Sequence, residues 1–360
     1  FAVEIFSLDL VFTSLVPLLL ASVAAVITSY FFRGTDVLFS FELLDAWRVK
    51  DIIFYVFLGL ATGIASVYFS KMYFLITRFF AWFSNAYIKI GIAALAIGLM
   101  LYLFPPLYGE GYGLINNLLN GETEAALNGI QYQIDFNNIW IVVAILLLIA
   151  VFKAIAMTTT FAAGGVGGIF IPTLFMGSAL GNSVAKVINQ FGFEVSESNF
   201  TLIGMTGLMA GVLHAPLTAI FLIAEITGGY DLFVPLMLVA TISFGFTKYF
   251  VPNSIYTAEL AKRGELITKD KDKNALMMLN IDRIIETDFI KISSEMTLGE
   301  LLRKGVSKSS RNIFPVVDET EQFLGIVLLD DVRSVMFEQS LYENTTVSLF
   351  MKSAPNVIFY

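Results

Sequence analysis

Long apolar segments dominate the chain as far as about residue 264, and short polar or glycine-containing breaks separate them. Several of these segments reach the length of about 20 residues that a helix needs to cross a bilayer; the candidate spans are 8–32, 49–83, 87–104, 137–159, 168–188 and 232–250. The 35-residue run at 49–83 is long enough that it must tilt or project from the bilayer. This pattern predicts an all-α membrane region built from tilted helices.

Two further apolar segments, 199–213 and 215–227, are too short to cross alone. They are separated by "LHAP", where Pro216 forces the preceding residue out of helical geometry. Half-length helices are typical of transporters and channels, because non-helical backbone at membrane depth persists only where protein covers it or where it lines a watery cavity.

The pattern changes in the last part of the chain, where half of the 52 charged residues fall within 265–360. Short apolar stretches alternate there with helical ones. Strands are expected at 289–292, 313–317 and 324–328, a helix at 297–304, and a further helix that Asp330 and Asp331 open. We therefore expect a small water-soluble α/β domain behind the membrane region.

Composition supports a membrane protein and excludes several other classes. The mean hydropathy is +0.76, and charged residues make up 14% of the chain, against roughly a quarter in soluble domains. The absence of cysteine and the single histidine, His214, exclude disulfide frameworks, thiolate metal sites and a His-Glu-x-x-His protease. A net charge of −8 without a basic run argues against nucleic-acid binding. We expect no enzyme and no required cofactor or metal.

The stretch "AAGGVGGIFIP" at 162–172 places four glycines directly before an apolar segment. A helix that starts there has first N–H groups without internal partners and a partial positive charge, with Pro172 in its first turn, which makes an anion site. Small residues in a bilayer also serve close helix packing. The spacing alone leaves both interpretations open.

Four ordered motifs resemble the CLC family of chloride channels and chloride/proton exchangers. They are "GEGYG" at 109–113, "GGIFIP" at 167–172, "AGVLHAPLTAIFLIAEITGGY" at 210–230 and "IYTAELAKRGE" at 255–265. The resemblance implies a homodimer with one pore in each subunit and two inverted halves of tilted, partly half-length helices. The similarity of "AVEIFSLD" near the start to "IAEITGGYD" at 223–231 is in keeping with such a repeat, and the chain would hold the tail of the first half and all of the second.

The resemblance also assigns an anion site to Gly168, Ile169, Phe170 and Tyr256. Chloride would be held by backbone N–H groups and the tyrosine hydroxyl, which are neutral donors that balance lost hydration without trapping the ion. Apart from the resemblance, a Tyr near a helix start is commonly an interface anchor.

The first segment bears on proton coupling. In exchangers of the family two acids stand side by side in the segment that matches "FAVEIF"; here Glu4 matches the first and Ile5 stands in place of the second. This departure favours either a passive chloride channel without proton coupling, gated by voltage or ligand, or an exchanger that loads protons differently. H⁺/Cl⁻ exchange and passive conduction both stay open. A CBS-regulated divalent-cation transporter would need several intramembrane carboxylates, and Glu4 and Glu225 are nearly the only ones.

The C-terminal part resembles CBS modules, which are regulatory units. We assign 1–264 to the CLC-like membrane region, 265–276 to a linker, 277–340 to a CBS module and 341–360 to the start of a second, truncated one. Lys262 and Arg263 favour a cytoplasmic tail. The resemblance places Asp331 at an adenine-nucleotide site, but Leu328 stands where a Ser or Thr is expected, so nucleotide binding and a purely structural, dimerising tail both stay open.

Overall fold

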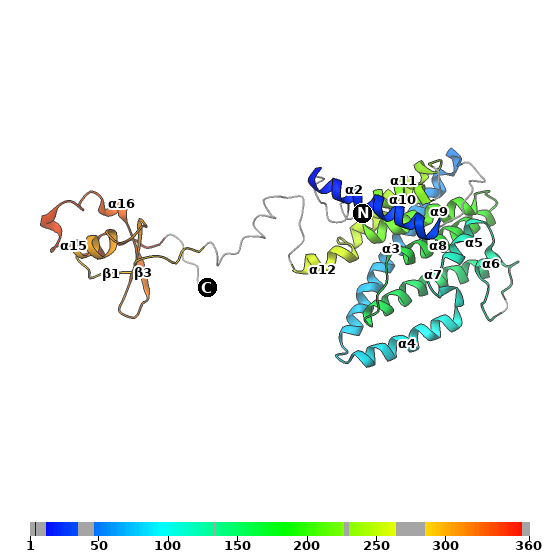
Figure 1. Ribbon diagram of the computed structural model, residues 1–360, viewed down its shortest axis with the longest axis horizontal. Coiled ribbons are helices and arrows are strands. Elements are labelled where there is room, and N and C mark those ends of the chain that lie inside the picture. Colours follow the sequence, from blue (N-terminus) through cyan, green and yellow to red (C-terminus); the bar gives the residue numbers. More distant parts are fainter. Residues whose placement is uncertain are drawn as a thin grey trace. The chain divides into compact units, whose positions relative to one another are not determined.

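The computed structural model describes residues 4, 12–34, 47–132, 134–226, 230–263 and 285–354. The chain divides into two compact units, Phe1–Asn274 and Ala275–Tyr360. Figure 1 shows that the first is helical and that the second carries a small sheet. The predicted linker at 265–276 and Ile5 lie outside the described residues.

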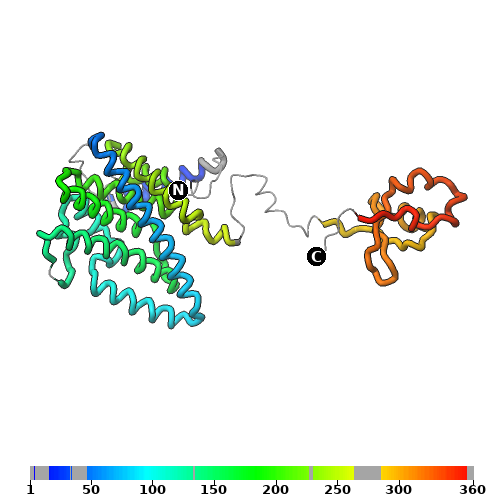
Figure 2. The backbone as a smooth tube through the Cα atoms, turned by 180° about the vertical axis from the view of Figure 1, so that it is seen from behind, coloured from blue at the N-terminus to red at the C-terminus, as the bar shows by residue number. Residues whose placement is uncertain are grey.

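The first unit consists of helices of very different lengths. They are α2 (Phe12–Arg33), α3 (Ile52–Ala81), α4 (Ala86–Leu103), α5 (Tyr112–Leu119), α6 (Thr123–Ala126), α7 (Ile139–Ala162), α8 (Phe170–Gln190), α9 (Glu197–Leu213), α10 (Pro216–Ile226), α11 (Phe233–Phe250) and α12 (Ile255–Arg263), with 3₁₀ turns η1 (Val49–Asp51) and η2 (Pro105–Leu107). In Figure 2, α3 runs as one long helix along this unit.

Among the described residues, four segments are long and apolar enough to cross a membrane: Val49–Ala81, Ala86–Leu103, Ile139–Ala162 and Phe233–Lys262. Helix α8 has the length predicted for a span but is less apolar, and its Thr173, Ser178, Asn182 and Ser183 are buried. It therefore lies inside the unit, covered by other helices. A helix enclosed by protein tolerates polar side chains where they find hydrogen-bond partners, as the hydroxyls of Thr173, Ser178 and Ser183 do with carbonyl groups of their own helix.

The predicted break between two half-length helices is confirmed. Helix α9 ends at Leu213; the next residue, His214, has a left-handed φ of 55°, and Pro216 opens α10. A left-handed residue ends the helical ladder, and a proline at the first helical position lacks only an N–H that would have had no partner. The backbone at the break is covered, since Leu213 and Ala215 are fully buried.

The second unit is a three-stranded sheet with short helices. Strand β1 (Ile292–Ser293) pairs in parallel with β2 (Ile313–Val317), which pairs antiparallel with β3 (Phe323–Leu328). Helix α15 (Leu298–Glu300) continues as a π-helical turn (Leu301–Val306), and α16 (Leu329–Val332) follows β3 directly. The predicted element order is confirmed, but the first strand was predicted at 289–292 and β1 covers Ile292 and Ser293, so it is shorter and displaced toward the C-terminus.

Residues that follow the assigned first CBS module pack against its core. Val347 is fully buried and its N–H donates to Met296 O at 2.8 Å, while Ile326 and Lys352 form a bridge with N–H to O distances of 2.9 Å in both directions. The boundary at 340/341 stays a prediction.

Candidate functional site

Small residues bring α8 and α9 into backbone contact. A Cβ atom added to Gly177 would lie 2.6 Å from Gly204 O, and one added to Gly181 would collide with Phe200 O. Residue numbers rise along α8 as they fall along α9, so the helices run antiparallel. In antiparallel helices, a residue before Gly177 in α8 lies beside a residue equally far after Gly204 in α9. Phe170, the first residue of α8, therefore lies level with Gly211.

Contacts between α9 and α3 show how deep in the membrane unit Gly211 and Phe170 lie. Gly207 lies against Thr62 and Gly211 against Ser66, whose hydroxyl donates to Leu208 O at 3.3 Å. Ser66 is the fifteenth of the thirty residues of α3. At 1.5 Å per residue it lies roughly 22 Å from either end of this helix, which is deep within a hydrocarbon core of about 30 Å. The α8 N-terminus therefore lies at the middle of the membrane unit.

Helices α11 and α12 meet at the same depth. Helix α11 runs parallel to α3, with Gly63 against Phe246 and the Thr247 hydroxyl donating to Gly63 O at 3.4 Å, so its last residue is level with the middle of α3. The Ser254 hydroxyl accepts the Thr257 N–H at 3.3 Å and caps α12. Helix α12 then follows the second half of α3, where Lys262 Nζ lies 5.9 Å from the centre of the Phe74 ring.

The start of α8 has backbone N–H groups that no helical bond among the described residues uses. The first N–H that closes a helical bond is that of Thr173, to Ile169 O at 3.2 Å. Earlier N–H groups have no intrahelical acceptor and carry the positive end of the helix dipole. Ile169 is buried and Phe170 partly buried, whereas a Cβ atom at Gly168 would meet nothing within 4 Å. Open space thus adjoins the predicted donors.

Tyr256 is the second residue of α12 and is 37% exposed. Helix α9 contacts both α8 and α12, so the two predicted parts of the anion site flank one helix at one depth. The structure brings the helix starts to the same level; the joint ligation of an anion by Tyr256 and the α8 amides stays a prediction.

Glu4 has a role that sequence analysis missed. Its carboxylate accepts the N–H groups of Leu217 at 2.7 Å and Thr218 at 2.8 Å, and the Thr218 hydroxyl at 2.7 Å. It therefore caps α10 from more than 200 positions away. By contrast, Glu225 near the end of α10 is exposed and accepts the Tyr230 hydroxyl at 3.4 Å.

Asp331 lies in the four-residue helix α16 and pairs with Lys352, with 2.6 Å between Lys352 Nζ and Asp331 Oδ1. A nucleotide bound there would have to compete with this internal ion pair.

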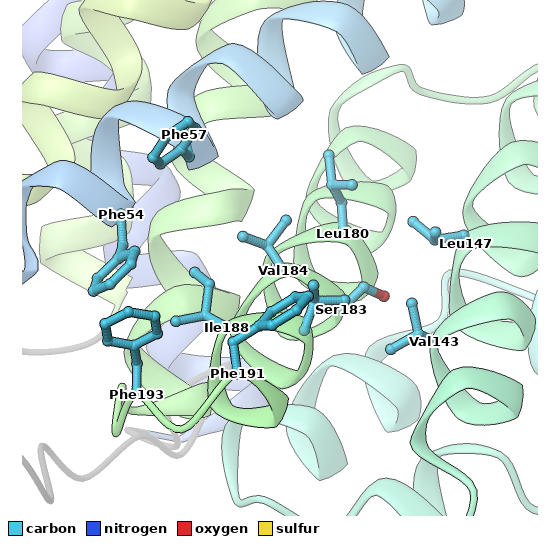
Figure 3. A pocket seen from close by; sticks show the side chains of 11 residues that line it. Phe54, Phe57, Val143, Leu147, Leu180, Ser183, Val184, Ile188, Phe191 and Phe193 are labelled. Carbon is cyan, nitrogen blue, oxygen red and sulfur yellow. The ribbon is translucent and has the colours of Figure 1, made fainter.

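A cavity of about 510 Å³ lies between α3, α7 and α8. Its lining is aromatic and aliphatic, with the Ser183 hydroxyl as its one polar side chain among the described residues; Figure 3 shows Phe54, Phe57, Phe191 and Phe193 around it. This cavity suits an apolar occupant and offers an ion no compensation for lost hydration.

A helical membrane unit with broken helices that meet at mid-depth has the architecture of an ion-transport protein. The sequence model described as "Voltage gated chloride channel" matches residues 1–248, and that of the CBS domain matches residues 281–338. The chain belongs to the voltage gated chloride channel family and carries a CBS domain behind its membrane region.

Named relatives agree with this assignment. The voltage-gated ClC-type chloride channel ClcB of Salmonella typhimurium is 25% identical over 272 residues, which are 73% of this chain and 60% of that protein. Chloride channel protein CLC-f of Arabidopsis thaliana is 24% identical over 381 residues, which cover 91% of this chain and 47% of that protein. The chain thus spans about half the length of these relatives.

The fold matches that of a slow cyanobacterial Cl⁻/H⁺ antiporter, with a TM-score of 0.54 and 23% identity over 67% of this chain and 53% of that one. At this identity the likeness shows the fold alone.

Proposed function

We propose that the protein transports chloride across a membrane and that the start of α8 forms half of its anion site. The single observation that carries this proposal is the depth of the α8 N-terminus, which the contacts of Gly177 with Gly204 and of Gly211 with Ser66 set at the middle of α3. N–H groups without an intrahelical acceptor at that depth would replace part of the hydration that chloride loses.

The donors in this site are neutral. The N–H groups of Ile169 and Phe170, beside Gly168, and the Tyr256 hydroxyl offer dipoles without a full charge. Dipoles allow an anion to enter and leave, whereas a contacting Lys or Arg would hold it. This donor set favours a transported halide over a permanently bound anion. It contains no carboxylate, which is the side-chain ligand that divalent cations such as Ca²⁺ and Mg²⁺ prefer.

Two transport modes fit this site: H⁺/Cl⁻ exchange, and passive conduction through a channel. The residues at the expected proton position support the channel, because the Glu4 carboxylate serves as a cap that accepts three hydrogen bonds at the start of α10. Ile5, beside it in sequence, cannot carry a proton at all.

The family resemblance supports three further parts of the proposal: a homodimer with one pore in each subunit, a cytoplasmic CBS tail, and regulation through that tail. Regulation through the tail would include binding of an adenine nucleotide at Asp331. Such binding requires that the ion pair between Asp331 and Lys352 opens.

The test uses the full-length protein in liposomes with a chloride gradient. We expect a reversal potential set by chloride. If a superimposed pH gradient shifts it, transport is coupled to protons; if it stays at the chloride equilibrium, the protein is a channel. Liposomes that show no chloride current or flux above protein-free controls would contradict the proposed function.

A further inference from the structure

Lys153 is a charged side chain buried inside the membrane unit. It lies in the second half of α7 and is 5% exposed; among the described side chains, Asp51 is the other buried charged one. A charge at this depth is costly unless its surroundings compensate for lost hydration, so its partners indicate what it does.

The Lys153 ammonium group is fully engaged within the protein. Its Nζ donates to Leu107 O at 3.1 Å and to Gly109 O at 2.8 Å, and it lies 4.5 Å from the centre of the Phe175 ring. Lysine has three N–H donors; two bond carbonyl oxygens and the remaining side faces the negative face of the ring. No donor is left to hold an anion directly, so Lys153 acts through its neighbours.

Phe175 is held from a second side by the "GEGYG" motif. Gly111 has a φ of +89°, and a Cβ atom there would collide with Cδ2 of the Phe175 ring. The ring is fully buried. Lys153, the turn at 107–111 and Phe175 therefore form one cluster, which we call the lysine clamp. The clamp explains why this turn contains glycine and why it approaches α8.

The clamp joins the two helices that flank the glycine-rich turn. Helix α7 ends at Ala162 and leads into this turn, and α8 leaves it at Phe170. Lys153 is fixed on the first helix and Phe175, in the second turn of α8, on the other. The place of the α8 N-terminus relative to α7 is thus set by contacts that include the ammonium group.

We propose that Lys153 is a positioning residue for the anion site: through the carbonyl groups of Leu107 and Gly109 and the ring of Phe175, it sets where the first N–H groups of α8 lie. This inference rests on the proposed function of the α8 N-terminus. A neutral side chain at position 153 would leave two carbonyl groups without their donor and the ring without its charged partner, so the turn and α8 would shift together.

The experiment measures chloride affinity of the purified full-length protein by calorimetry, with thermal unfolding recorded for each variant. We expect Lys153→Met to weaken chloride binding roughly tenfold or more, on the scale of a lost charged hydrogen bond. Lys153→Arg keeps the charge and donors and should stay within about twofold of wild type. Phe175→Leu should also weaken binding, and the double variant with Lys153→Met by less than the product of the two effects.

Lys186→Met is the matched control. Lys186 lies in the same helix as Phe175, but it pairs with Glu197 at 2.6 Å near the far end of α8. The Lys186→Met variant should have a lower unfolding temperature and the same chloride affinity as wild type. If the lysine clamp only stabilised the fold, Lys153→Met would likewise lower the unfolding temperature and leave the chloride affinity unchanged.

Chloride affinity equal to wild type in folded Lys153→Met and Phe175→Leu overturns the inference while leaving the proposed function intact. If Lys153→Met does not fold, Phe175→Leu decides alone, and its unchanged affinity is the contradicting result. Absence of chloride binding in the wild-type protein would instead contradict the proposed function itself.

Discussion

In the proposed anion site, recognition would depend on neutral hydrogen-bond donors of single residues. Tyr256 would contribute a hydroxyl from the start of α12, and Ile169 and Phe170 would contribute backbone N–H groups from the start of α8. A substitution of Tyr256 removes its hydroxyl, whereas no side-chain substitution removes the backbone N–H groups of Ile169 and Phe170 as long as α8 keeps its position.

Tyr256→Phe tests the hydroxyl with little change in shape. A net hydrogen bond is worth about 0.5–1.5 kcal/mol, so chloride affinity should fall roughly 2- to 10-fold. Calorimetry on the full-length protein measures this. Tyr87→Phe is the control, since Tyr87 is 85% exposed on α4 and should leave the affinity unchanged. Equal affinities for Tyr256→Phe and wild type would remove Tyr256 from the site.

Residues with local signals were predictable, and residues with distant partners were not. The glycines before "IFIP" and Pro172 mark a helix start by their chemistry alone. Glu4 and Lys153 look like isolated charges in apolar sequence, because the N–H groups that Glu4 accepts are more than 200 positions away and the carbonyls that Lys153 bonds are 46 and 44 positions away. The one sequence signal for Glu4 and Lys153 is that each is a charged residue in an apolar run, where burial costs free energy unless the charge has a partner.

Among the secondary-structure elements, close packing of α3, α8 and α9 controls the depth of the site. Glycines spaced four apart, Gly177 with Gly181 and Gly207 with Gly211, line the contacts. Small residues at this spacing allow close helix packing in a bilayer. The glycines within α8 and α9 therefore pack, and their packing sets the depth at which α8 begins. For the glycine run at 164–168, packing and an anion site both stay predictions.

Gly177→Ala tests this packing. The added Cβ atom would lie 2.6 Å from the backbone oxygen of Gly204, so α8 and α9 must separate, at a cost of about 1–3 kcal/mol of stability. Thermal unfolding in detergent should show a lower midpoint. Gly245→Ala in α11 meets nothing within 4 Å and should be neutral or stabilising, because alanine favours helix. A Gly177→Ala protein as stable as wild type would contradict the close approach.

The CBS unit offers a prediction on pH. Hydrogen bonds from the Lys304 side chain and from the Thr297 backbone hold the pKa of Glu300 below its usual value. A depressed pKa means that the carboxylate stabilises the unit above the unfolded pKa and that this contribution is lost as pH falls through the folded pKa.

Glu300→Gln should therefore lower the unfolding temperature of the CBS unit at neutral pH and make little difference in acid below the folded pKa. Thermal unfolding followed across that pH range measures the difference between the two proteins. If the difference in unfolding temperature between wild type and Glu300→Gln stays constant as the pH falls, the charge of Glu300 is not the cause of that difference.

The helix breaks were easier to predict than the interior of the unit. Pro216 and the apolar segment lengths identified α9 and α10 correctly. Helix α8 was predicted by length, but hydropathy alone does not reveal that its Thr, Ser and Asn side chains are buried among neighbouring helices. In the second unit the strand predicted at 289–292 shares only Ile292 with β1, because the residues that pair with β2 are Ile292 and Ser293.

For the whole molecule, the boundary between a membrane region and a charged tail follows from hydropathy and charge alone. The meeting of helix ends at one depth does not, because it depends on contacts among α3, α8, α9 and α11 that lie far apart in sequence. The chain spans about half the length of its relatives, so transport is a property to be measured on the full-length protein.

The most direct test of the account is a crystal structure of the full-length protein grown in bromide, with anomalous scattering used to locate the ion. We predict a bromide peak within hydrogen-bonding reach of the backbone N–H groups of Ile169 and Phe170 and of the Tyr256 hydroxyl. Bromide ordered elsewhere in the membrane unit, with none at the start of α8, would contradict the central claim.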